Sequence, residues 1–229
     1  MQSNKTTLEF SVSAISTSPD LFFGSLPLLE GSSVTRIHID AMDGNFVPRL
    51  GLSPEFVSGI RNFSQMPVDV HMMVREPTPF IKNFASAGAT RIIPHFECSD
   101  HPHRLVREIK DLGLEAGLAL NPLTDFRSLK YVLPDLSVIT LMAINPGIIG
   151  HKFISFISDK IIELKNFLYE AAFEIPIEID GGVTFDNISD LYTNGANLLV
   201  SGAGTVYHPS ATVEENLKRL SSISDELKL

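Results

Sequence analysis

Short apolar runs alternate along the chain with longer segments in which apolar residues recur at helical spacing. The runs are rich in β-branched residues and end at polar residues or glycines, a pattern typical of buried parallel strands. They predict strands at residues 9–15, 35–40, 68–73, 90–94, 115–120, 136–142, 175–179 and 197–201.

The segments between these strands carry the signals of helices. Ser18-Pro19-Asp20 and Ser53-Pro54-Glu55 each place a capping serine before a proline and an acid in the first turn. Glycines such as Gly88 and Gly195 stand where two of the helices would end. Beyond the two serine starts, helices are predicted at residues 77–87, 102–112, 125–132, 156–172, 185–193 and 213–227.

Eight strands that alternate with eight helices favour a single (β/α)8 TIM barrel with parallel strands over residues 1–229. A doubly wound open sheet is the competing architecture, but it rarely holds eight units in a chain of 229 residues. No linker, low-complexity stretch or block of charge marks a domain boundary. In such a barrel the carboxyl ends of the strands build the active site.

Composition and charge indicate which partners and which compartment the protein would have. The formal net charge of −9 argues against nucleic acid, which requires basic patches. The apolar runs are too short for a transmembrane helix and the start of the chain lacks a secretory signal, so no membrane association is expected. The single cysteine, Cys98, forms no internal disulfide and suits a reducing compartment, which predicts a cytoplasmic protein.

Two histidines and two aspartates lie at or near the ends of predicted strands. His38 and Asp40 are two residues apart on one strand, so their side chains share a face. His71 lies near the end of the next strand, and Asp180 directly follows the seventh. Two imidazoles and two carboxylates at one end of a barrel form a plausible ligand set for a divalent metal, and carboxylates can also move protons.

Two further acids share strand faces with these residues, one layer deeper. Asp69 precedes His71 by two residues, and Glu178 precedes Asp180 by two. They could orient the ligands as second neighbours of the metal, or they could be interior polar groups with partners of their own. The sequence leaves both interpretations open.

Six motifs follow one another along the chain, and the His-x-Asp-x-Met-Asp-Gly and Asn-Pro-Gly runs are the most specific of them. In order, they are Ser13-Ala14-Ile15-Ser16, His38 through Pro48, Asp69 through Val74, Gly117 through Pro122, Met142 through Gly147, and Glu178 through Gly182. With these motifs the chain resembles the ribulose-phosphate 3-epimerase family from about Phe10 to Tyr207.

The resemblance implies an isomerase of the pentose phosphate pathway, which interconverts D-ribulose 5-phosphate and D-xylulose 5-phosphate through a cis-enediolate. It implies one divalent metal ion, Zn, Fe, Mn or Co, held by His38, Asp40, His71 and Asp180. Asp40 would begin as the base and Asp180 as the acid, with the roles exchanged in the reverse direction. It also implies a homo-oligomer, because family members commonly associate.

The resemblance also implies a set of substrate-binding residues. Met42, Met73 and Met142 would form a thioether wall that excludes water, and Ser16 would hydrogen-bond the substrate. The phosphate would lie on backbone N–H groups of the loops after the sixth, seventh and eighth strands. The residues in these loops are Gly147, Ile148, Ile149, Gly150, Gly181, Gly182, Gly202 and Ala203.

Four positions depart from the family pattern. Ile149 replaces a glycine, Ala203 a serine, Arg49 an asparagine and Val12 a proline. We expect all four in the outer substrate-binding region. The metal-binding and catalytic residues would then be intact, while the contacts to the far end of the substrate would be altered. Two alternatives therefore stay open: the same chemistry on another ketose phosphate such as allulose 6-phosphate, or a catalytically silent barrel that binds a sugar phosphate.

Overall fold

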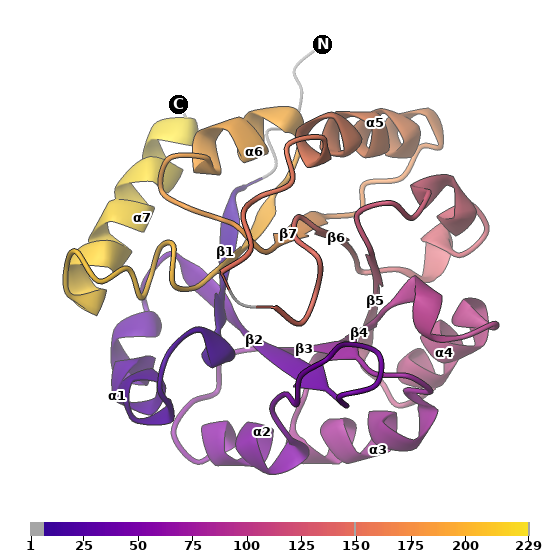
Figure 1. Ribbon diagram of the computed structural model, residues 1–229, viewed down its shortest axis with the longest axis horizontal. Helices are drawn as coiled ribbons and strands as arrows, with labels where there is room; N and C mark the ends of the chain where they lie inside the picture. The colour runs from indigo at the N-terminus through magenta and orange to yellow at the C-terminus, as the bar shows by residue number, and fades with distance from the viewer. Residues whose placement is uncertain (1–6, 149, 229) are drawn as a thin grey trace.

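Eight parallel strands close into one barrel in the order of the sequence, with helices packed around the outside (Figure 1). The structure is a computed structural model that describes residues 7–148 and 150–228. The closed barrel confirms the predicted (β/α)8 architecture and excludes the open sheet. Its strands are β1 Glu9–Ser13, β2 Val34–Met42, β3 Val68–Met73, β4 Arg91–Pro94, β5 Glu115–Leu120, β6 Val138–Met142, β7 Ile177–Asp180 and β8 Leu198–Ser201.

The predicted strands differ from these only at their ends. The first is shorter than predicted, because Ala14–Ser16 turns into a 3-10 helix at the mouth of the barrel. The second is longer and pairs in register with β3, from Ile37 opposite Val68 to Met42 opposite Met73. This extended pairing fixes two neighbouring strands up to the end of the barrel where the candidate residues lie.

The helices are α1 Pro19–Leu29, α2 Pro54–Arg61, α3 Thr78–Ala87, α4 Pro102–Asp111, α5 Ile157–Glu170, α6 Ile188–Asn194 and α7 Val213–Lys228. Ser18 caps α1 as predicted, because its hydroxyl accepts the backbone N–H of Leu21 at 3.3 Å. Ser53 stands at the N-cap of α2 as predicted, but its side chain makes no capping hydrogen bond to the helix. In the described part of the chain, no helix has the length and apolar character that a membrane crossing requires.

The α-helix predicted at residues 125–132 is wrong in type. Two short 3-10 helices, Phe126–Leu129 and Leu133–Asp135, connect β5 to β6 instead. Asp125 caps the first by accepting the backbone N–H of Arg127 at 2.9 Å. Pro134, which has no N–H to donate, stands in the first turn of the second 3-10 helix, where that N–H is not needed.

The apolar core lies mainly between the barrel and its helices, with a smaller cluster inside the barrel formed by Ile93, Ala119, Val138 and Leu198. The expectation that Val12 lies in the substrate-binding region is wrong. Val12 is fully buried in the outer core. Side chains alternate along a strand, so Val12 points away from the interior that its neighbour Ser13 faces.

Charged and polar side chains share the barrel interior with this small cluster. Asp69 is fully buried and accepts hydrogen bonds from Arg36 Nε at 2.8 Å and from Arg91. Glu178 is also fully buried and accepts from the Thr140 hydroxyl at 2.7 Å. Asp69 therefore has interior partners of its own, which favours the second of the two interpretations for that residue.

Candidate metal and proton-transfer site

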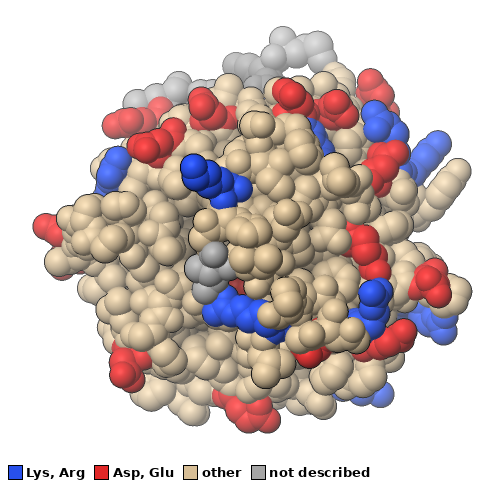
Figure 2. All heavy atoms as spheres, in the orientation of Figure 1, with Lys and Arg blue, Asp and Glu red and all other residues tan. Residues whose placement is uncertain are grey.

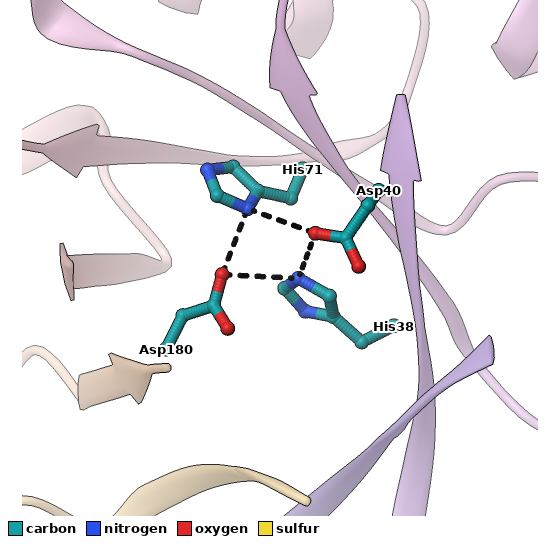
Figure 3. Close-up of side chains that lie close together, drawn as sticks. All are labelled: His38, Asp40, His71 and Asp180. Carbon is teal, nitrogen blue, oxygen red and sulfur yellow. Dashed lines mark ion pairs between the residues drawn. The ribbon is translucent and has the colours of Figure 1, made fainter. Parts of the chain in front are cut away.

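The four predicted ligands come together at the carboxyl end of the barrel (Figure 3). His38 and Asp40 project from β2, His71 from β3 and Asp180 from the end of β7. Asp40 lies directly opposite His71 in the register of β2 and β3. Both imidazoles are fully buried and Asp40 is 7% exposed.

One atom from each residue contributes to a compact ring in which nitrogen and oxygen alternate (Figure 3). His38 Nε2 lies 3.5 Å from Asp40 Oδ1 and 3.7 Å from Asp180 Oδ2. His71 Nδ1 lies 3.5 Å from the same Asp40 oxygen and 3.0 Å from the same Asp180 oxygen. All four atoms are within 4.8 Å of one another.

This ring fits a divalent cation. Metal bonds of about 2.0–2.2 Å place neighbouring ligand atoms about 2.8–3.6 Å apart, depending on the coordination angle. The observed separations of 3.0–3.7 Å nearly match that range. In addition, His38 Nε2 and His71 Nδ1 are buried and have no hydrogen-bond partner among the described residues. Buried polar atoms are normally satisfied, so these nitrogens point to a ligand between them.

The electrostatics of the site agree with the geometry. Burial alone would lower the pKa of His38, but the carboxylates of Asp40 and Asp180 raise that pKa to about 10. The pKa of His71 is raised as well, because the same two carboxylates outweigh its burial. Conversely, the pKa of Asp40 is lowered despite burial, because both imidazoles favour its charged form. The carboxylate pair thus draws positive charge into the site, whether carried by protons or by a metal.

The sequence reasoning missed two polar contacts that hold Asp40 and His71, two of the four candidate ligands, in place. The Ser13 hydroxyl donates to Asp40 Oδ2 at 3.2 Å, so the other oxygen of Asp40 faces the imidazoles. On the far side, His71 Nε2 lies 2.9 Å from Nε2 of the buried His95. A histidine two residues before Glu97, just after the fourth strand, was the available sequence signal for this contact.

A cavity of about 260 Å³ opens beside the two aspartates of this cluster. Asp40 and Asp180 line it, and so does Arg49. Ile149 lies outside the described residues, so the structure gives no position for it. The other expected substrate-binding residues all line this cavity, namely Ser16, Met42, Met73, Met142, Gly147, Ile148, Gly150, Gly181, Gly182, Gly202 and Ala203.

At one corner of the cavity, glycines let the backbone lie where a side chain would not fit. Gly181 and Gly182 have φ values of 97° and 67°, and a side chain on Gly181 would collide with Ile144. A side chain on Gly202 would collide with the Ser16 hydroxyl. Within residues 7–148 and 150–228, no acceptor receives the backbone N–H of Gly182 or Ala203. This corner therefore offers free donors of the kind that bind an anion.

The charged side chains around the mouth of the cavity also favour an anion. Figure 2 shows Lys and Arg atoms next to the central opening, whereas Asp and Glu atoms lie mainly toward the rim. Arg49 lines the cavity, and its guanidinium forms no ion pair with a described residue. A cation without a counter-ion beside free N–H donors favours a negatively charged ligand.

Fold and site together define a TIM-barrel protein whose polar centre lies at the carboxyl ends of the strands. The chain belongs to the ribulose-phosphate 3-epimerase family, whose model matches residues 13–206. This is a family of isomerases that act on carbohydrates.

Individual relatives agree with this assignment. The chain is 37% identical to the ribulose-phosphate 3-epimerase of Escherichia coli K12, over 83% of this chain and 86% of that protein. It is 42% identical to the ribulose-phosphate 3-epimerase of Bacillus subtilis 168, over 76% of this chain and 81% of that protein. Among solved structures, a mutant tryptophan synthase α-subunit from Pyrococcus furiosus aligns over 98% of both chains with a TM-score of 0.66. At 15% identity, that likeness concerns the fold alone.

Proposed function

We propose that the protein interconverts D-ribulose 5-phosphate and D-xylulose 5-phosphate with one divalent metal ion held by His38, Asp40, His71 and Asp180. The observation that carries the proposal is the arrangement of the two aspartates. Asp40 and Asp180 come from different strands, both line the cavity, and both face the same two imidazoles. The relatives named above carry the corresponding activity in their names.

Epimerisation at carbon 3 requires a proton to leave one face of the substrate and another to arrive on the opposite face. In our proposal Asp40 removes the proton next to the ketone, which gives a cis-enediolate. Asp180 then protonates that carbon from the other side, and the roles are exchanged in the reverse direction. When bound, the metal supplies Lewis acidity that polarises the ketone oxygen. Zn²⁺, Fe²⁺, Mn²⁺ and Co²⁺ all suit two imidazoles with two carboxylates.

The walls of the cavity protect this chemistry. Met42, Met73 and Met142 line the cavity beside the two aspartates and are themselves buried. Three thioethers exclude water, which would otherwise protonate the enediolate on the wrong face. We therefore assign these methionines to the shielding of the intermediate, and Ser16 to a hydrogen bond with the substrate.

The phosphate of the substrate would occupy the glycine-rich corner. The free backbone N–H groups of Gly182 and Ala203 are suitable donors, because backbone donors hold an anion without adding side-chain charge. Arg49 would add a charge-assisted contact from the mouth of the cavity. A grip that includes Arg49 explains how an otherwise acidic chain could bind a doubly charged phosphate group.

A panel of substrates tests the proposal and its alternatives. The protein, stripped of metal and then reloaded with each of the four candidate ions, is assayed with ribulose 5-phosphate, xylulose 5-phosphate and allulose 6-phosphate. We expect metal-dependent turnover that is fastest with the five-carbon pair. Faster turnover of allulose 6-phosphate would reassign the substrate, and tight binding without turnover would support a silent sugar-phosphate-binding barrel. The cytoplasmic location and the homo-oligomer stay predictions, to be tested by cell fractionation and light scattering.

A further inference from the structure

A line of buried hydrogen bonds leads from His71 away from the cavity. His71 turns Nδ1 toward the aspartates, and its other ring nitrogen, Nε2, lies 2.9 Å from Nε2 of His95. The remaining nitrogen of His95, Nδ1, lies 3.2 Å from Oε2 of Glu97. Both imidazoles are fully buried, and their ring centroids lie 5.0 Å apart with an interplanar angle of 21°. The two rings are therefore nearly edge to edge, as a hydrogen bond between ring nitrogens requires. These three side chains form what we call the His71 relay.

The far end of the relay is anchored. The other oxygen of Glu97, Oε1, accepts the backbone N–H of Asn121 at 2.8 Å and also the hydroxyl of Thr124. The loop that supplies these donors is itself fixed, because Lys160 Nζ donates to the carbonyl oxygens of Asn121 and Thr124 at 3.2 and 2.7 Å. The Glu97 carboxylate therefore cannot rotate without losing contacts at both of its oxygens.

The anchored carboxylate fixes which nitrogen donates and which accepts at each step of the relay. The Glu97 carboxylate only accepts hydrogen bonds, so His95 must carry a proton on Nδ1. A neutral His95 then has a bare Nε2, which can only accept the proton that His71 carries on its own Nε2. A neutral His71 protonated at Nε2 has a bare Nδ1. That nitrogen is the one aimed between Asp40 and Asp180.

We propose that His95 and Glu97 are positioning residues that hold His71 in the tautomer and orientation required of a metal ligand. Outer hydrogen bonds of this kind fix ligand rings at metal sites, and their loss commonly costs 10–100-fold in metal affinity. The inference rests on the metal site under Proposed function. It makes metal affinity depend on His95 and Glu97, which contact neither the cavity nor the atoms that would bind the ion.

Glu97→Gln is the most informative variant, because a glutamine amide cannot accept hydrogen bonds from both His95 and Asn121 as the carboxylate does. If its oxygen stays on the Asn121 N–H, its NH2 group faces His95 Nδ1 and reverses the relay. His71 would then carry its proton on Nδ1, which blocks ligation. If the amide flips, its NH2 group meets the backbone N–H of Asn121, which cannot accept. We expect zinc affinity to fall about 10–100-fold.

Two variants of His95 separate hydrogen bonding from packing. His95→Leu fills a similar space but offers no acceptor to His71, so zinc affinity should fall at least about tenfold. His95→Gln can still present a carbonyl oxygen to the Nε2–H of His71 and should recover most of that loss. Thr124→Val is the matched control, because it removes one contact to Glu97 but leaves the Asn121 N–H and the charge in place. Its affinity should stay within about threefold.

The measurement is zinc affinity by competition with a chromophoric chelator, with the unfolding of each metal-free variant recorded alongside. A two-bond ¹H–¹⁵N spectrum of the zinc-loaded parent reports directly which ring nitrogen of His71 carries the proton, even if a variant fails to fold. Nε2 protonation and selective weakening in Glu97→Gln and His95→Leu support the inference. Unchanged zinc affinity in Glu97→Gln, or a proton on Nδ1 of His71 in the parent, overturns it. Failure of the parent to bind zinc, iron, manganese or cobalt overturns the metal site itself.

Discussion

Asp69→Asn is expected to destabilise the fold strongly while leaving the metal site intact. Asp69 is fully buried and pairs with two guanidinium groups, Arg36 at 2.7 Å and Arg91. An asparagine retains one accepting oxygen but removes the charge that balances both arginines inside the barrel. Breaking a buried ion pair by removing one partner costs about 3–5 kcal/mol. For a protein of this size that corresponds to a fall in Tm of about 6–20 °C.

The matched control removes a second carboxylate from the same arginines. Glu115 lies 3.1 Å from Arg36 and 3.6 Å from Arg91, but its side chain is 49% exposed. Water therefore screens its charge, and Glu115→Gln should cost less than about 1 kcal/mol. Urea unfolding of both variants gives the two free energies, and chelator competition gives the zinc affinity of Asp69→Asn.

This comparison decides between the two interpretations of Asp69 that the sequence left open. A large loss of stability with zinc affinity within about threefold of the parent identifies an interior ion pair. The reasoning is refuted if Asp69→Asn loses under about 1 kcal/mol of unfolding free energy, or if its zinc affinity falls by the 10–100-fold typical of a residue that orients ligands.

Four further predictions concern the site and its surroundings. Asp40→Asn and Asp180→Asn should each lower turnover at saturating metal by at least about 10²-fold, and near-normal turnover in either metal-loaded variant would contradict the two-face mechanism. Arg49→Ala should raise the Michaelis constant about 10–150-fold with little change in kcat, as measured by steady-state kinetics, if its guanidinium contacts the phosphate. The pKa of His38 is raised to about 10 in the fold, above its unfolded value of 6.5. The protonated imidazole therefore adds to the unfolding free energy of the metal-free protein below pH 6.5, and this contribution is lost as pH rises toward 10. A metal must displace this proton, and the raised pKa of His71 adds to the effect. Metal affinity should therefore rise at least about tenfold per pH unit between pH 6.5 and 8, and a flat calorimetric profile would count against it. Burial raises the pKa of Cys98 to about 12, so a thiol reagent at pH 8 should label it only after unfolding.

The sequence predicted the strands, and the meeting of the four candidate ligands at one end of the barrel, because both depend on local rules. Alternation along β2 places His38 and Asp40 on one face, and the barrel topology brings β3 and β7 to the same end. The helical pattern failed at residues 125–132, where Asp125 caps a short 3-10 helix in place of an α-helix. Val12 was misplaced because a comparison of residue types says nothing about which face of a strand a position occupies.

The contacts between the candidate ligands and their outer neighbours could not be predicted from local patterns. His95 meets His71 only because β3 and β4 are paired, and Glu97 is fixed by a loop that follows β5. Ser13 reaches Asp40 across the pairing of β1 with β2. Each of these contacts joins residues that are far apart in the sequence, and each depends on rotamers that only the folded barrel determines.

Solvent deuterium at carbon 3 tests the central claim most directly. Metal-loaded protein is incubated with ribulose 5-phosphate in D₂O, and the ketose pool is followed by ¹H NMR. Proton transfer through two aspartates predicts that xylulose 5-phosphate appears with deuterium at carbon 3 and at no other carbon. Xylulose 5-phosphate that keeps the original hydrogen at carbon 3, or no xylulose 5-phosphate at all with the metal bound, would contradict the account.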